Sequence, residues 1–206
     1  MSLFITFEGG EGSGKSVQVK ALYERLAGLS VPALRIYEPG ITSLGEKITY
    51  LLKWDQDTDI SSVSELLLFS ASRAQLVTEV IKPGLASGKV VICDRYADST
   101  MAYQGYGRGL DLEMVRAAKD VGMQGINPDL TFLLDIANEK GFARKREKGQ
   151  DRFEREKAAF HQRVREGYLK LAAAEPDRWL VVDASQPRAE VEKIIWEKVS
   201  RLLAIK

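Results

Sequence analysis

The sequence contains one cysteine and one histidine among its 206 residues, and its charges nearly cancel. Cys93 alone cannot form an internal disulfide, and its apolar neighbours predict a buried, inert thiol in a reducing cytosol. His161 stands in an amphipathic stretch, and we expect no catalytic role for it. Thirty basic and 29 acidic residues give a net charge of +1, which argues against a dedicated nucleic-acid or membrane binder. We find no signal-peptide pattern and no apolar run of about 18 residues, so we expect a cytoplasmic protein.

Length and periodicity predict the fold. With 206 residues, 45% of them apolar, we expect a single domain over residues 1–206. Short apolar runs predict strands at Leu3–Phe7, Ala33–Tyr37, Val90–Cys93, Leu130–Asp135 and Leu180–Val182. Helical periodicity between them predicts helices at 15–27, 44–54, 62–82, 111–122, 151–174 and 187–204. The alternation indicates an α/β fold, a doubly wound parallel five-stranded sheet flanked by helices, with ligands at the carboxyl ends of the strands.

The first strand is followed by a glycine-rich segment that matches the phosphate-binding pattern G-x-x-x-x-G-K-[ST]. A strand, a glycine-rich loop and a helix in this order direct backbone N–H groups and the positive helix end at an anion. In this pattern Lys15 reaches the outer phosphates and the Ser16 hydroxyl ligates Mg²⁺. The sequence therefore predicts ATP-type nucleotide binding by Gly9, Gly10, Glu11, Gly12, Ser13, Gly14, Lys15 and Ser16.

A second metal-holding position is predicted where the apolar strand Val90–Cys93 runs into Asp94. Its carboxylate is expected to orient water or Mg²⁺ near the loop serine. Asp135 ends another apolar strand and is a competing candidate. The neighbouring Arg95 favours Asp94, because a guanidinium fork suits phosphate oxygens and belongs beside a metal-binding carboxylate.

The third predicted helix carries both local signals and candidate binding residues. The Ser62-x-x-Glu65 spacing predicts a capping box at its start, and Lys82-Pro83-Gly84 is expected to end it. Phe69 and Arg73 lie one turn apart and therefore on one face. An aromatic plane beside a fixed donor suits base recognition, although a phenylalanine alone is equally typical of a core.

Two further segments are candidates for the walls of a site. Residues 94–110 mix hydroxyls, an amide, aromatics and glycines, which suits a binding wall better than a packed element. Residues 138–151 carry five cations, a composition that is usual for a solvated face. In a nucleotide-binding fold, a mobile lid that brings Arg144 or Arg146 onto phosphates is the competing interpretation.

Together these segments resemble the bacterial thymidylate kinases of the P-loop nucleoside monophosphate kinase superfamily. The set Phe-x-x-x-Arg, Asp-Arg-Tyr and Tyr-Gln-Gly is far more specific than the phosphate loop alone. The matching pieces occur in the family's order over nearly the whole chain, at residues 4–16, 38–40, 67–75, 94–96, 102–105, 107–109, 127–131 and 151–154. The resemblance implies a phosphotransferase that converts dTMP and ATP to dTDP and ADP in dTTP synthesis, usually as a homodimer.

The resemblance also implies roles for individual residues on the acceptor side. Phe69 would stack on thymine, while Arg73 and Gln104 would hydrogen-bond its polar edge. Glu11 would meet the 3′-hydroxyl of the sugar, and Tyr103 would leave no room for a 2′-hydroxyl. The residues implied to bind dTMP are Glu11, Glu38, Phe69, Arg73, Arg95, Ser99, Tyr103 and Gln104.

On the donor side, the resemblance places Arg144 against adenine at the base of a lid over residues 138–151. Lid cations after it would neutralise the transferring phosphoryl group. The metal would be held by Ser16 and Asp94. The residues implied to be catalytic are Lys15, Asp94, Arg95 and Arg146.

The chain departs from the family where arginines are usual, at Tyr37 and at Thr49. The second arginine normally lies near the monophosphate. Lys47 and Lys53 are candidates to supply the lost charge, although a lysine cannot reproduce a bidentate fork. Three alternatives therefore stay open: a kinase for another monophosphate, a regulatory nucleotide-binding paralogue with weak turnover and, disfavoured by the net charge, an RNA-binding protein that uses the cations of residues 144–148.

Overall fold

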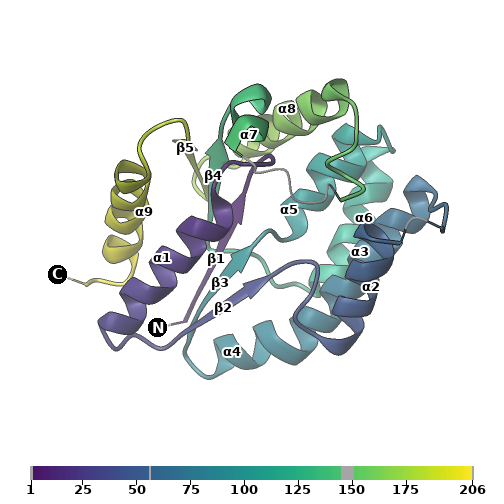
Figure 1. The fold of residues 1–206 in the computed structure, drawn as a ribbon. Helices are drawn as coiled ribbons and strands as arrows, with labels where there is room; N and C mark the ends of the chain where they lie inside the picture. The colour runs from purple at the N-terminus through teal and green to yellow at the C-terminus, as the bar shows by residue number, and fades with distance from the viewer. Residues whose placement is uncertain (1, 56, 145–150, 206) are drawn as a thin grey trace.

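The computed structural model describes residues 2–55, 57–144 and 151–205. Its parallel sheet has the strand order β2-β3-β1-β4-β5, so the predicted doubly wound five-stranded sheet is confirmed (Figure 1). The strands are β1 (Leu3–Glu8), β2 (Ala33–Tyr37), β3 (Val90–Asp94), β4 (Leu130–Asp135) and β5 (Trp179–Asp183). The helices are α1 (Lys15–Gly28), α2 (Ser43–Lys53), α3 (Ser62–Leu76), α4 (Lys82–Ala86), α5 (Ala97–Thr100), α6 (Leu112–Met123), α7 (Asn138–Arg144), α8 (Ala158–Ala174) and α9 (Arg188–Leu202), with π-helical segments η1 (Val77–Ile81) and η2 (Met101–Gly107).

The central strand β1 is buried on both faces, and its side chains alternate between two cores. Leu3, Ile5 and Phe7 pack with the apolar stripes of α1 and α9. These two helices cover the same face of the sheet (Figure 1). Phe4 points to the other face, where the end of α3, η1 and α6 contribute apolar side chains. Cys93 is buried in this second core, and burial raises the pKa of its thiol, as expected for an inert cysteine. In the described ranges, no helix is long and apolar enough to cross a membrane.

The parallel register brings three chain segments to one edge of the sheet. Phe7 of β1 and Tyr37 of β2 both pair with Asp94 of β3, so these strands end at the same level. The loop after β1 starts beside Glu8, and Glu38 follows the end of β2. Because strand ends in an open α/β sheet face a crevice, this edge is where a ligand site is expected.

The start of α3 differs from its prediction. Ser61, not Ser62, is the N-cap, and its side chain accepts a hydrogen bond from the Ser64 N–H. The capping-box interpretation of Glu65 is therefore wrong. The Glu65 side chain is fully buried and is engaged with side chains far away in the sequence, which outweigh a local cap.

The end of this helical region was also predicted wrongly. Lys82-Pro83-Gly84 does not end it, because the chain continues through η1 into α4 and stops at Ala86. Pro83 falls in the first turn of α4, directly after η1, and its ring fixes a φ that a helix can use. The wider turn of η1 accommodates the junction.

Two other predicted segments have different structures. The helix expected at 151–174 begins only at Ala158, because Asp151 starts a turn in which its Oδ1 accepts from the N–H groups of Phe153 and Glu154. Residues 94–110 are largely helical, in α5 and η2, and mostly buried, so the expectation that they do not form a packed element is wrong. This helical segment nevertheless lines the cavity described next.

Candidate active site

The phosphate loop joins β1 to α1 and leaves the helix N-terminus open. Gly14 is the N-cap of α1 with a φ of 88°, and no side chain caps the first turn. At Gly12, which has a φ of 68°, an added Cβ would lie 1.9 Å from the carbonyl oxygen of Gly141 in α7. Glycine is therefore required by backbone conformation and by close packing. The uncapped N–H groups can bind an anion, as the sequence predicts.

Lys15 lies folded back onto this loop. Its Nζ donates to the carbonyl oxygens of Gly9 and Gly10 at 3.1 and 2.8 Å, and to Ser13 Oγ at 3.2 Å. Burial lowers the pKa of Lys15 to about 8, and the charge of Arg95 acts in the same direction. An anion bound in the loop would stabilise the charged ammonium, because an opposite charge counteracts burial.

The two predicted metal ligands meet at the mouth of the loop. Ser16 Oγ donates to Asp94 Oδ2 at 2.5 Å. The competing Asp135 instead receives Arg165 Nε and Nη2 at 2.7 and 2.8 Å and ties β4 to α8. No three histidine, cysteine or acidic side chains of the described residues form a metal cluster. A hydroxyl and one carboxylate fit Mg²⁺, which is usually completed by water and substrate phosphates.

Arg95 connects the loop to a second cavity. Its backbone has a φ of 68°, a left-handed conformation that is rare for a bulky residue and found at functional sites. The guanidinium donates to Gly9 O at 3.0 Å and Tyr168 Oη at 3.1 Å through Nη1, and to Glu11 Oε1 at 2.7 Å through Nη2. The arginine is thus held between the phosphate loop and α8.

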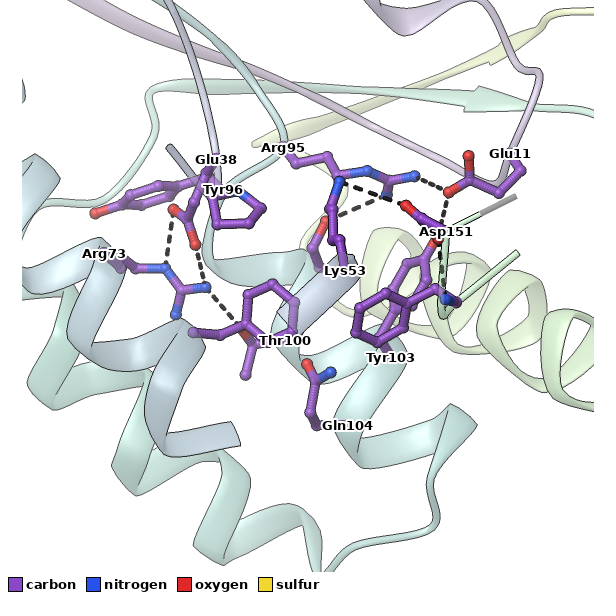
Figure 2. A pocket seen from close by; sticks show the side chains of 14 residues that line it. Glu11, Glu38, Lys53, Arg73, Arg95, Tyr96, Thr100, Tyr103, Gln104 and Asp151 are labelled. Carbon is purple, nitrogen blue, oxygen red and sulfur yellow. Dashed lines mark hydrogen bonds and ion pairs between the residues drawn. The ribbon is translucent and has the colours of Figure 1, made fainter. Parts of the chain in front are cut away.

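All eight residues predicted to bind the acceptor line this second cavity, whose volume is about 450 Å³ (Figure 2). A larger, open cavity of about 2400 Å³ contains the loop, Ser16, Asp94 and Arg144. The residues that line the smaller cavity are Glu11, Glu38, Pro39, Lys53, Phe69, Arg73, Arg95, Tyr96, Ser99, Thr100, Tyr103, Gln104, Asp151 and Phe153.

One end of the smaller cavity is formed by a buried ion pair. Arg73 donates through Nε and Nη2 to the two oxygens of Glu38 at 3.1 and 2.5 Å, and through Nη2 to Thr100 Oγ1 (Figure 2). Burial raises the pKa of Glu38, and the charge of Arg73 opposes this change. Arg73 Nη1 is buried and has no hydrogen-bond partner within the described residues. It is therefore a donor available to a ligand.

Aromatic rings line the middle of the cavity. The rings of Phe69 and Phe153 have centroids 5.7 Å apart, and the Tyr103 ring lies 6.0 Å from Phe153. The Tyr103 hydroxyl donates to Glu11 Oε1 at 3.1 Å. Phe69 is only half-buried and faces the cavity, so both predicted uses, core packing and ligand contact, are compatible with its position.

Glu8, a buried acid behind Arg95, was not among the predicted site residues. Glu8 accepts from the Tyr96 N–H at 2.8 Å, Ser99 Oγ at 2.6 Å and Tyr168 Oη at 2.9 Å. Burial, with a smaller contribution from Asp98, raises the pKa of Glu8 to about 7. The one available signal was a charged residue at the end of an apolar strand, where a partner is needed.

The predicted lid is described only in part. Residues 138–144 form α7, and Arg144 donates to the carbonyl oxygens of Ala184 and Ser185 at 2.7 and 3.4 Å beside the larger cavity. Arg146 lies outside the described residues. At the far end of the lid, Asp151 Oδ2 and Lys53 Nζ lie 3.7 Å apart (Figure 2).

The positions that depart from the usual arginines face solvent or the larger cavity. The Tyr37 hydroxyl donates to Glu46 Oε1 at 2.6 Å. Thr49 lines the larger cavity and donates to a carbonyl of its own helix. Of the two candidate lysines, Lys53 lines both cavities, whereas Lys47 is exposed and lines neither.

Comparisons with known proteins point to one family. The thymidylate kinase family model matches residues 7–195. A thymidylate kinase of Dehalococcoides mccartyi (strain CBDB1) is 54% identical over 203 residues, covering 98% of this chain and 98% of the relative. A thymidylate kinase of Deinococcus radiodurans is 49% identical over 201 residues, covering 96% of each chain. Among solved structures, the thymidylate kinase of Ehrlichia chaffeensis has a TM-score of 0.79 and 34% identity, and the match covers 96% of this chain and 98% of that one.

Proposed function

The chain belongs to the thymidylate kinase family, and we propose that it transfers the γ-phosphate of ATP to dTMP, giving dTDP and ADP. The observation that carries this proposal is the pair of adjoining cavities. Glu11, Lys53 and Arg95 line both of them, whereas loop residues 12–16 line only the larger one. Such an arrangement holds a donor and an acceptor end to end, which is what phosphoryl transfer requires.

The larger cavity is proposed to bind ATP. The loop N–H groups and the Lys15 ammonium would hold the phosphates, and Arg144 would lie beside the adenine. Ser16 and Asp94 would hold Mg²⁺, which supplies positive charge to the donor phosphates when bound. Lys15 and Arg95 would stabilise charge on the transferring group without covalent participation.

The smaller cavity is proposed to bind dTMP. Its aromatic middle suits the stacking of a pyrimidine, with Phe69 as one face. Arg73 Nη1 is an unused donor for a carbonyl of the base, and Gln104 lies in the same wall. Arg95, held at the boundary of the cavities, would grip the monophosphate, while Glu11 would meet the sugar. Glu38 and Ser99 would act by holding Arg73 and Arg95.

Several further assignments belong to this proposal. The chain is proposed to act as a single kinase domain over residues 1–206, in which residues 138–151 form a lid whose Arg146 approaches the transferring phosphoryl group. We further propose a cytoplasmic homodimer with no nucleic-acid or membrane partner, in line with the balanced charge.

A coupled ADP-release assay with dTMP, dUMP, UMP, CMP and AMP in parallel tests the proposal. We expect Mg-ATP-dependent turnover of dTMP, with UMP, CMP and AMP much poorer. Sites built on specific polar contacts reject mismatched analogues by factors of up to about 10⁴–10⁵. Equal rates with UMP and dTMP would contradict the acceptor assignment. ATP binding without turnover of any monophosphate would contradict the enzymatic function itself.

A further inference from the structure

The direction of the Gln104 side-chain amide is fixed by a buried carboxylate. Gln104 is almost fully buried, and its Nε2 donates to Glu65 Oε1 at 2.8 Å. Glu65 is fully buried in α3 and receives Arg108 Nε at 3.1 Å and Arg108 Nη2 at 3.0 Å. A carboxylate paired with an arginine only accepts hydrogen bonds, so it can face only the amide nitrogen of Gln104.

This direction decides what Gln104 offers to a ligand. Its nitrogen is engaged with Glu65, and within the described ranges no donor reaches its Oε1 oxygen. Gln104 lines the smaller cavity together with Arg73, whose buried Nη1 is a donor without a partner. Among the described residues of the cavity wall, Gln104 therefore offers an acceptor and Arg73 offers a donor.

This pair complements one class of pyrimidine edge. A 4-oxo pyrimidine such as thymine presents a carbonyl at position 4 and an N–H at position 3, which match a donor and an acceptor. A 4-amino pyrimidine such as cytosine presents an amino group at position 4 and an unprotonated ring nitrogen at position 3. It therefore has a donor where thymine has an acceptor, and an acceptor where thymine has a donor. A glutamine that turned its amide over would accept the second pattern.

We propose that Glu65 is a positioning residue that selects 4-oxo over 4-amino pyrimidine monophosphates by holding the amide of Gln104 in one direction. The inference rests on the proposed function, because it assumes that the smaller cavity binds the base of the acceptor. It assigns to Glu65 a part in substrate choice without contact with substrate.

The test compares two acceptors that differ only at positions 3 and 4 of the base, dTMP and 5-methyl-dCMP. The variant is Glu65→Gln, in which the side chain carries one oxygen and one NH₂ group and no longer dictates the direction of Gln104. We expect the ratio of kcat/KM for dTMP to that for 5-methyl-dCMP to fall by about tenfold or more, with the ATP KM unchanged. Some preference for dTMP should remain, because Arg73 still donates to the carbonyl at position 4.

A matched control is available on the same arginine. Arg108 also pairs with Glu156, which lies outside the cavity, so Glu156→Gln loosens Arg108 and leaves the contact of Glu65 with Gln104 intact. This control should keep the wild-type ratio. If Glu65→Gln does not fold, Glu65→Gln combined with Arg108→Gln removes the carboxylate and the arginine that forms hydrogen bonds with it, and it should lower the ratio equally.

The outcomes separate the inference from the function on which it rests. A lowered ratio in the Glu65 variant and an unchanged ratio in the Glu156 control support the inference. Equal losses with both acceptors, or an unchanged ratio, overturn it, since a merely structural Glu65 predicts that result. A wild-type protein without turnover of dTMP would instead overturn the proposed function, and this inference with it.

Discussion

The two halves of the candidate active site are held together over very different lengths of chain. In the phosphate loop, Lys15 contacts Gly9 and Gly10, six and five residues away. In the acceptor cavity, Arg73 contacts Glu38 at a separation of 35 residues. The cavity contacts of Gln104 and Arg95 span 39 and 84 residues. The phosphate loop itself is a local backbone structure, although its Ser16 meets Asp94, 78 residues away, whereas the acceptor cavity is assembled by the whole fold.

This difference predicts different costs of mutation. The loop binds phosphate chiefly through backbone groups, so its side chains can change without loss of the fold. The acceptor side chains are partners in buried ion pairs and hydrogen bonds, so the same residues that recognise the ligand also stabilise the protein. Substitutions in the phosphate loop should therefore lower activity and leave stability nearly unchanged. Substitutions in the acceptor cavity should lower both.

The largest effect is expected for Arg73→Met. This change leaves the Glu38 carboxylate buried without its partner, and breaking a buried pair in this way costs about 3–5 kcal/mol in the free energy of unfolding. It also removes the donor offered to the base, so the dTMP KM should rise. Urea unfolding and steady-state kinetics measure the two losses.

The double variant Arg73→Met with Glu38→Gln is the control for this prediction. It removes both charges, so most of the lost stability should return while the dTMP KM stays high. Coupling of stability and recognition would be disproved if Arg73→Met alone unfolded at the wild-type urea concentration.

The next effect concerns the local half. Lys15→Ala should lower kcat by about 100- to 1000-fold for every acceptor, the usual loss when one donor to a transition-state charge is removed. Stability should change little, because burial lowers the pKa of Lys15 and its charge is unfavourable in the empty loop. Lys20→Ala, an exposed residue of the same helix, is the matched control and should leave both quantities unchanged. A large loss of stability in the Lys15 variant would remove the contrast between the halves.

The same difference explains what could be predicted from the sequence. The phosphate loop, the buried strands and Asp94 at a strand end are recognisable from residues adjacent in the sequence. Their pattern therefore predicts both the fold and the position of the site in it. Glu65 shows the limit, because its spacing matched a capping box and its partners lie 39 and 43 residues away. The prediction that Lys82-Pro83-Gly84 ends the helix was wrong for another reason: a π-helical turn precedes Pro83, and the helical path continues past it.

A smaller effect is expected from pH, through Glu8 behind the acceptor cavity. Its pKa is raised from 4.5 to about 7 by burial, so the folded protein binds this proton more tightly than the unfolded chain. Stability should therefore fall by roughly 3 kcal/mol as pH rises from about 4.5 to 7. Glu8→Gln should remove this part of the slope. Its amide oxygen can accept from the Tyr96 N–H, and the hydroxyls of Ser99 and Tyr168 can accept from its NH₂ group. Urea unfolding of both proteins between pH 5 and 8 measures it, and parallel slopes would refute the assignment.

The smallest effect is expected at Thr49, where the family usually has arginine and where this chain has a cation one turn later. Thr49 lines the larger cavity, and the longer side chain in Thr49→Arg would extend toward the boundary of the two cavities, which Lys53 and Arg95 line. A charge-assisted hydrogen bond to the acceptor phosphate there is worth about 1.5–3 kcal/mol. The dTMP KM should fall by about tenfold or more, with the ATP KM nearly unchanged. Lys53→Met identifies the alternative, because Lys53 lines both cavities and pairs with Asp151, whereas Lys47→Met is a control that touches neither cavity. If Thr49→Arg has no effect and Lys53→Met raises the dTMP KM, the lysine already fills the role of the missing arginine. The acceptor half would then tolerate an exchange of cations between turns, because its geometry depends on where a charge lies in the fold rather than on its place in the sequence.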